Sequence, residues 1–269
     1  MSSENTATPV ASGPPAGRPQ RPPPKAVEVK RVERLSPHMV NVTFTGPELA
    51  AFGWNGPAAH IKVIFANEPA TVPGESPRRL MRTYTPRRFD RAALELDVEF
   101  VIHGDGPASA WASQAAVGQR LMIGGQGRNY VVDESADWFL LMGDDSALPA
   151  LCTILDVLPA SARALVYVEV IDRHEERKLA TRANAAVTWL HRGEDSQSAG
   201  RLLEASLRTL EFPAGNGRVY IACESGAMRR MRRHLLTERG FDREKIVTRG
   251  YWKLGETDHP DRDYGEDAV

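Results

Sequence analysis

The chain has 269 residues, of which 42% are hydrophobic and 26% are charged, and its formal net charge is −1. This length suits one large globular domain or two smaller ones with a substantial core, and the balanced charge argues against a nucleic-acid-binding protein. Two cysteines in unrelated contexts, Cys152 and Cys223, form neither a disulfide framework nor a zinc motif. Since neither a signal peptide nor a membrane-length apolar run is present, we expect a cytoplasmic protein without stable membrane insertion.

The chain begins with a proline-rich segment. The first 25 residues hold seven of the 19 prolines and almost no large apolar side chain. Such a segment cannot bury enough surface to offset its conformational entropy, so we expect residues 1–26 to be a disordered tail. A proline-rich ligand for a partner protein is the alternative interpretation.

Residues 27–134 are predicted to form a small antiparallel β-barrel or sandwich. Short runs of alternating, β-branched or aromatic character follow one another, separated by Gly, Pro and Asn: "AVEVKRVERLS", "MVNVTFTG", "HIKVIFAN", "RTYTPRRF", "LELDVEFVIH" and "QRLMIGG". The stretch "GPASAWASQA" interrupts them and predicts a short helix, with Pro107 at its first position.

Residues 135–257 follow a different pattern, in which strands and helices alternate. The expected strands are "DWFLLMGDD", "RALVYVEVID", "AAVTWLHRG", "GRVYIACES" and "KIVTRGYWKLG", and the helices between them are "SALPALCTILDVLP", "GRLLEASLRTL" and "AMRRMRRHLLTERG". This alternation predicts a parallel sheet covered by helices on both faces. Residues 258–269 are taken as a C-terminal tail.

Two stretches combine residue types that bind anions. In "LLMGDDSALPA", Asp145 and Ser146 lie where a strand ends and a helix opens, a position that suits a nucleotide phosphate, although Ser146 also suits a helix N-cap. In "RTYTPRR", Arg82, Tyr84 and Thr85 lie among further arginines. A solvated basic edge strand explains those further arginines better than it explains these three residues. The "GGQGRN" run leads into a strand and is rejected as a dinucleotide fingerprint.

Five motifs in order extend this interpretation: "RTYTPR", "VIHGDGPASAWA", "GDDSALPA", "CESGAMRRMRRHL" and "GYWKLGE". Together they resemble the siderophore-interacting protein family of FAD-dependent ferric-siderophore reductases, over Val27 to Gly255. The resemblance implies a ferredoxin-reductase-like fold, with an N-terminal β-barrel that binds FAD and a C-terminal α/β Rossmann-like domain that binds NAD(P)H. It also implies reduction of ferric siderophores. The alternatives are a general flavin or ferredoxin-type reductase and a non-catalytic siderophore-binding module.

The resemblance also implies roles for single residues. Arg82 pairs with an FAD phosphate, Tyr84 packs on the flavin, and Thr85, the candidate catalytic residue, hydrogen-bonds near flavin N5. The other implied FAD contacts are Val101 and His103 on the flavin, and Gly106, Ala108 and Ser109 on the diphosphate. The alternative interpretation of the stretch from His103 to Ser109 is a tight turn whose histidine is satisfied by local hydrogen bonds.

The predicted nucleotide contacts are Asp145, Ser146 and Glu169. Glu169 mildly favours NADH, whereas the "RRMRR" run favours NADPH. Met228 and Met231 between those arginines have helical spacing and should face the core, which makes a solvated arginine face the simpler interpretation. The donor therefore stays NAD(P)H, with reduced ferredoxin as an alternative.

The resemblance implies that iron arrives as a ferric siderophore, and the sequence suits this, because no histidine pairs with another ligand at metal spacing. Many siderophore complexes are anionic, so the pocket should be basic although the whole chain is not. Through the resemblance, the candidate cations are Lys62, Arg128 and Lys253; the alternative is that all three are solvent-exposed charges that serve solubility. Lys253 stands where many family members carry Arg, which keeps the charge but loses the bidentate fork.

Overall fold

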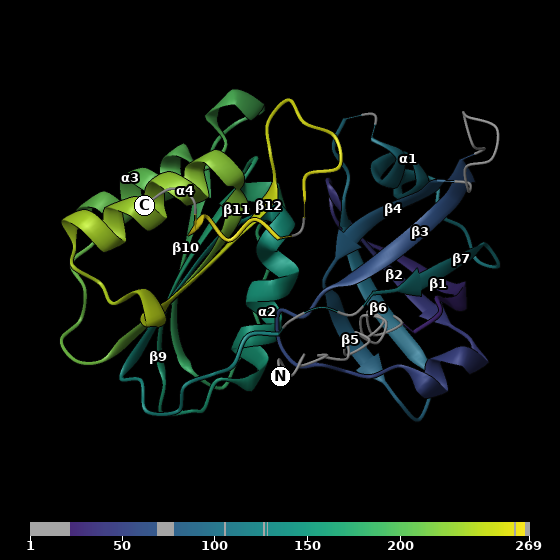
Figure 1. The fold of residues 1–269 in the computed structure, drawn as a ribbon, viewed down its shortest axis with the longest axis horizontal. Coiled ribbons are helices and arrows are strands. Elements are labelled where there is room, and N and C mark those ends of the chain that lie inside the picture. Colours follow the sequence, from purple (N-terminus) through teal and green to yellow (C-terminus); the bar gives the residue numbers. More distant parts are fainter. Residues whose placement is uncertain are drawn as a thin grey trace, which may run out of the picture.

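The computed structural model describes residues 22–68, 78–104, 106–125, 127, 129–260 and 262–266, which form two sheets side by side (Figure 1). Residues 1–21 of the predicted tail lie outside the described residues. Lys25 and Ala26 already belong to the first strand, where they pair with Ile123 and Met122, so the folded part begins earlier than the sequence suggests.

The first sheet has seven antiparallel strands in the order β4-β3-β7-β1-β2-β6-β5. Their bounds are β1 (Lys25–Ser36), β2 (Met39–Thr45), β3 (Ile61–Glu68), β4 (Arg78–Tyr84), β5 (Pro86–Asp90), β6 (Glu95–Val101) and β7 (Arg120–Gly124). The two edge strands, β4 and β5, are consecutive in the chain and joined by Thr85 alone. The sheet therefore curls so that its two edges meet at Thr85, and the predicted barrel is confirmed.

Alternation along the strands builds the barrel core. In β6, Leu96, Val98 and Phe100 are fully buried and point inward, as expected for a period of two. A 3-10 turn (Pro47–Ala51) and helix α1 (Pro107–Ser113) pack against this barrel, and α1 contacts β2, β3 and β6. The predicted short helix is thus present, with Pro107 at its first position.

The second sheet has five parallel strands in the order β10-β9-β8-β11-β12. Their bounds are β8 (Trp138–Asp144), β9 (Arg163–Val170), β10 (Asn184–His191), β11 (Gly217–Glu224) and β12 (Ile246–Trp252), and the helices are α2 (Leu148–Val157), α3 (Arg201–Thr209) and α4 (Ser225–Arg233), the last continued by a π-helical turn, η5 (His234–Glu238).

Strand β8 shows why the sequence gives a sheet covered on both faces. Phe139 and Leu141 face the cluster around α2, whereas Leu140 and Met142 face α3 and α4. All of these side chains are at most 1% exposed. A strand buried on both faces reads as a continuous apolar run, and "WFLLM" is such a run.

Helix α4 confirms one interpretation and corrects another. Met228, Met231 and Leu235 are fully buried, as their helical spacing predicts. Arg232, however, is 4% exposed, and its guanidinium donates to the Thr248 hydroxyl, so it does not belong to a solvated arginine face. The covering residues come from the C-terminal segment, since Gly265 lies against the Arg232 side chain.

Helix α2 lies between the two sheets and joins them. Met39, Ala58 and Tyr130 of the barrel domain belong to the same buried cluster as α2, and the Ala58 backbone N–H donates to Thr153 Oγ1 at 2.9 Å. Ion pairs of Arg87 with Asp156 and of Arg177 with Glu99 also cross this interface. The largely apolar contact fixes the two domains relative to each other.

The segment after β12 is packed rather than a free tail where the structure describes it. The Asp263 carboxylate, 3% exposed, accepts hydrogen bonds from the Ser225 hydroxyl, Arg229 and the Gly265 backbone N–H. The Arg249 guanidinium lies 4.7 Å from the Tyr264 ring centroid. This corrects the expectation of a C-terminal tail from residue 258. Among the described residues, none of the helices is both long and apolar enough to cross a bilayer.

Candidate active site

The seam of the barrel carries the three residues singled out in "RTYTPR". Thr85, which joins the edge strands, is 6% exposed. The Arg82 side chain is 24% exposed, and its guanidinium donates to the Met81 carbonyl at 2.8 Å and lies 3.4 Å from Asp258 of the C-terminal segment. Both of these contacts are made by Nη1, and the side chain is partly exposed, so Arg82 can still bind an anion.

An aromatic cluster joins this seam to helix α1. The Tyr84 ring centroid lies 4.4 Å from that of Phe100 in β6, which lies 5.4 Å from that of Trp111 in α1. Burial raises the pKa of the Tyr84 phenol well above its ordinary value. The structure therefore brings together two motifs that the sequence could only propose separately.

A pocket of about 370 Å³ lies beside α1, and its lining residues are Ile102, Gly104, Ser109, Ala110, Ser113 and Gln114. The buried Ser109 hydroxyl accepts the His103 backbone N–H at 2.8 Å, which fixes the turn before the helix. A side chain at Gly104 or Gly106 would meet nothing within 4 Å, so a ligand can approach this backbone closely.

The remaining predicted flavin contacts, His103, Ala108 and Val101, differ in how much of their side chains a ligand could reach. His103 is exposed, and Ala108 is 8% exposed, so Ala108 offers its backbone rather than its methyl group. Val101 packs against the cluster around α2 that joins the domains. Among the predicted flavin residues, Val101 is thus the one whose side chain is used in packing at the domain interface.

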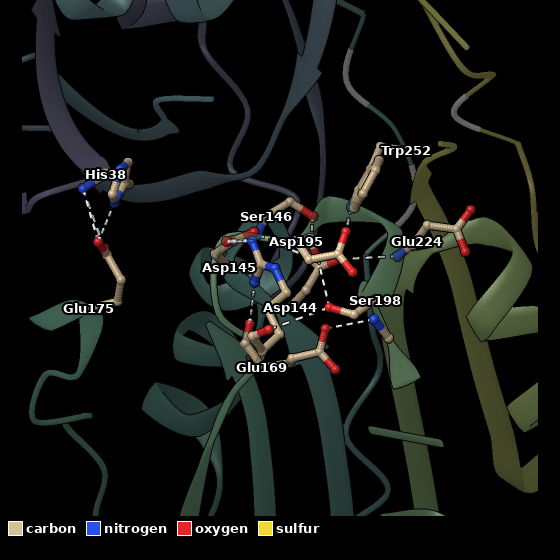
Figure 2. A network of polar contacts seen from close by, with 12 residues as sticks. His38, Asp144, Asp145, Ser146, Glu169, Glu175, Asp195, Ser198, Glu224 and Trp252 are labelled. Atoms are coloured by element: carbon tan, nitrogen blue, oxygen red, sulfur yellow. Dashed lines mark hydrogen bonds and ion pairs between the residues drawn. The ribbon is translucent and has the colours of Figure 1, made fainter. Parts of the chain in front are cut away.

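Acidic residues end three neighbouring parallel strands, and Figure 2 shows this edge. Asp144, Glu169 and Glu224 end or nearly end β8, β9 and β11, and all three are buried. Asp145, next to Asp144, forms an ion pair of 2.7 Å with Arg192. A short 3-10 turn, η2 (Asp145–Ala147), follows β8 and contacts β6 of the barrel.

Ser146 and Glu169 are both held by protein contacts. Ser146 donates its N–H and its hydroxyl to Asp144, so the cap of this turn is Asp144 and not Ser146. The Glu169 carboxylate is fully buried and accepts N–H groups of Gly200, Leu202 and Leu203 at the start of α3. These contacts argue against the ribose role predicted for Glu169 and give it a capping role instead.

Burial governs the electrostatics of this edge. It raises the pKa of Asp144 to about 7, with the neighbouring Asp145 carboxylate as the next cause. Burial also raises the pKa of Glu169, against the lowering effect of its backbone donors. Arg192 supplies a compensating positive charge to both Asp144 and Asp145.

The three candidate substrate cations have different surroundings. Lys62 Nζ donates to Thr83 Oγ1 at 2.6 Å, and its stem lies beside Gly125. Lys253 pairs with Glu256, and each of these side chains is 46% exposed. Arg128 lies outside the described residues. The contact of Asp258 with Arg82 brings the segment after Lys253 to β4, the strand next to Lys62.

Sequence reasoning missed the contacts of Asp144 and of Glu175. Glu175 accepts hydrogen bonds from the backbone and ring of His38 across the domain interface (Figure 2). It also accepts one from the Ser36 hydroxyl. The role of Asp144 could have been predicted, because it directly follows the apolar run "WFLLMG". A carboxylate buried with that strand needs hydrogen-bond donors around it. No group of metal-ligand side chains occurs among the described residues.

Two family models match the chain. The model described as the siderophore-interacting FAD-binding domain matches residues 28–130, and the model described as siderophore-interacting protein matches residues 136–255. The first match spans β1 to β7 after the first few residues, and the second spans β8 to β12.

Similar proteins cover most of the chain. The ferric vibriobactin reductase ViuB of Vibrio cholerae is 30% identical over 251 residues, covering 87% of this chain and 91% of that protein. The NADPH-dependent ferric-chelate reductase of Escherichia coli is 28% identical and covers 85% of this chain and 92% of that protein. A siderophore utilization protein from T. fusca has a crystal structure with a TM-score of 0.78 and 33% identity, covering 90% of this chain and 98% of that one. The similarity thus extends over both sheets.

Proposed function

The chain belongs to the siderophore-interacting protein family, and on that basis we propose that it is an FAD-dependent reductase of ferric siderophores. Electrons pass from NAD(P)H through FAD to chelated Fe³⁺, and Fe²⁺ is released. The observation that carries the proposal is the contact of η2 with β6, which brings the turn predicted to bind the nucleotide next to a strand predicted to border the flavin.

The described residues fit FAD. A partly exposed guanidinium, a nearby buried threonine, and a pocket beside a glycine-containing turn offer the charge, the hydroxyl and the open backbone that a flavin nucleotide needs. We assign Arg82 to a phosphate, Tyr84 and Thr85 to the flavin ring system, and the turn at Gly106 to Ser109 to the diphosphate. When bound, FAD converts a two-electron donor into a source of single electrons.

For the nucleotide, the carboxyl edge of the parallel sheet is the proposed site, since ligands of such sheets bind there. Asp145 and Ser146 lie on the turn that contacts the barrel, and Arg192 lies beside them. NADH and NADPH both suit this edge, and reduced ferredoxin is the alternative donor. We do not carry Glu169 into this site, because its carboxylate caps α3.

For the substrate, we propose that Lys62, Arg128 and Lys253 attract anionic ferric siderophores. Hard oxygen donors hold Fe³⁺ more tightly than Fe²⁺, so one-electron reduction loosens the metal without any protein ligand. Residues 27–134 then serve as the FAD-binding domain and residues 135–257 as the nucleotide-binding domain. We place the reaction in the cytoplasm, where nicotinamide nucleotides are available.

Steady-state turnover tests the proposal. The purified, FAD-loaded protein is given NADH, NADPH or reduced ferredoxin under anaerobic conditions, together with ferric catecholates or hydroxamates and a ferrous trap. We expect donor-dependent Fe²⁺ formation with at least one chelate. Reduction of free flavins or ferredoxin without any Fe²⁺ would favour the general reductase instead, and a protein that binds the chelate but no flavin would favour the binding module.

A further inference from the structure

One buried carboxylate ties together three loops at the nucleotide end of the parallel sheet. Asp144 is 1% exposed and accepts four hydrogen bonds. Its Oδ1 accepts the Ser146 N–H at 3.0 Å and the Ser146 hydroxyl at 2.5 Å, and its Oδ2 accepts the Glu224 N–H at 3.0 Å and the Trp252 indole Nε1–H at 2.8 Å. These donors follow or end the neighbouring strands β8, β11 and β12.

Each donor belongs to a segment that borders the proposed nucleotide site. Ser146 lies on the turn η2, which contacts the barrel. Glu224 caps α4 through the Ala227 N–H at 2.8 Å, and its other oxygen lies 3.4 Å from the Leu254 N–H. Trp252 is half-buried, and Figure 2 shows its ring rising from Asp144 away from the sheet edge.

The chemistry of Asp144 suits this task and no neutral isostere reproduces it. A carboxylate has only acceptors, and all four partners are donors. An asparagine amide would turn an N–H₂ group toward one pair of these donors, so either Trp252 and Glu224 or Ser146 would lose their acceptor.

The backbone before Asp144 is closely packed as well. Gly143 has no room for a side chain, because a Cβ would lie 2.8 Å from Ala147 Cβ and 2.9 Å from the Ala222 carbonyl oxygen.

We propose that Asp144 is a positioning residue for the nucleotide half-reaction, because it fixes the Trp252 indole, the turn at Ser146 and the loop after β11 as one unit. The nicotinamide nucleotide then meets a surface that is already arranged, which lowers the entropic cost of reaching a reactive geometry. Asp144 itself is out of reach of the nucleotide, since it is buried beneath these partners. This inference rests on the proposed function, in which NADH or NADPH is the donor.

A spectroscopic measurement tests the positioning without any turnover. The chain has five tryptophans, so the indole N–H region of a ¹H–¹⁵N spectrum is sparse, and Trp252→Phe assigns the Trp252 signal. In D144A, which removes both acceptor oxygens, we expect this signal to move upfield and to exchange faster with solvent, while the other indole signals stay in place. An unmoved Trp252 signal in D144A would overturn the inference whatever the nucleotide donor is.

Stopped-flow then measures the two half-reactions of FAD-loaded protein separately. D144N should lower the second-order rate constant of flavin reduction by the nucleotide about 10-fold, the scale of one lost hydrogen bond to a charged group. Reoxidation by a ferric chelate should change by no more than about 2-fold, since none of the residues that donate to Asp144 is one of the three cations proposed to attract the chelate. W252F should produce part of the defect alone and add little to D144N, because the two share one contact.

Asp133→Asn is the matched control. Asp133 also pairs with a partner of the parallel sheet, the mostly buried Arg218, but at the start of β11 and therefore at the opposite end of the strands from Asp144. It should change neither half-reaction by more than about 2-fold. Equal losses in D144N and D133N, or equal losses in both half-reactions of D144N, would make Asp144 a merely structural residue and overturn the inference. A wild type that neither nucleotide reduces would instead refute the proposed donor.

Discussion

Arg82 allows the sharpest test of the flavin assignment. The structure shows a carboxylate, Asp258, that competes with phosphate for its guanidinium, and a second arginine on the same strand, Arg79, that serves as a control. A charge-assisted hydrogen bond to phosphate contributes about 1.5–3 kcal/mol, and every 1.4 kcal/mol is about tenfold in affinity. Arg82→Ala should therefore weaken FAD binding by roughly 10- to 150-fold. The exposed part of the guanidinium places this estimate toward the lower end, since solvent already screens it.

Asp258 lies 3.4 Å from Arg82 and is 61% exposed, so it competes weakly for the same donors. Asp258→Asn, which tolerates the positive φ of 61° at this position, should leave FAD affinity unchanged or tighten it by up to about 5-fold. Arg79→Ala removes a charge from the same strand without a predicted flavin contact and should change affinity by less than about 2-fold.

The assay is titration of FAD into apoprotein, followed by fluorescence quenching or calorimetry at two salt concentrations. The wild-type affinity should fall with salt more steeply than that of R82A, because the variant has lost the charge that salt screens. Equal FAD affinities of R82A and R79A would show that Arg82 does not hold the phosphate.

Three further predictions follow from other parts of the structure. Lys62→Glu, Lys253→Glu and Arg128→Glu should each raise the apparent KM for an anionic ferric siderophore and leave nucleotide-driven flavin reduction almost unchanged; stopped-flow separates the two, and the defect should shrink with a neutral hydroxamate chelate. Asp263→Ala should lower the free energy of unfolding by about 2–3 kcal/mol in chemical denaturation, because it leaves buried donors without an acceptor, whereas an unchanged midpoint would mean that the C-terminal segment is not part of the cooperative unit. Burial raises the pKa of Asp144 from 3.8 to about 7, so the acceptor-only carboxylate that meets its four donors is formed as the pH rises through about 7, and the half-reactions are compared above that pH. The stability that the bound proton contributes is full below about pH 4 and lost as the pH rises through about 7, so D144N should lose less stability than the wild type across that window.

The strands and helices could be predicted from local sequence patterns, because the spacing of apolar residues shows which side of each element is buried. The run "WFLLMG" predicts a strand covered on both faces, and the spacing of Met228 and Met231 predicts the buried side of α4. The five motifs, taken in their order, indicated the family and the residue roles that it implies, which no single motif could indicate.

The remaining features depend on partners far away in the sequence. Arg232 is buried by a segment more than 30 residues later, and Asp263 finds its donors 38 and 34 residues earlier, in Ser225 and Arg229. Glu169 looked available for a ribose because its partners at the start of α3 lie 31 or more residues downstream. No local period encodes such contacts, so the sequence indicated a charged side chain but not what it binds.

The most direct test of the central claim is a single anaerobic mixing experiment. FAD-loaded protein is reduced completely, freed of excess reductant, and mixed with a ferric catecholate siderophore in the presence of a ferrous trap. The account predicts that flavin absorbance returns with saturable dependence on siderophore concentration and that Fe²⁺ appears in proportion to the electrons lost by the flavin. Reduced flavin that persists beside the ferric siderophore, with no trapped Fe²⁺, would contradict it.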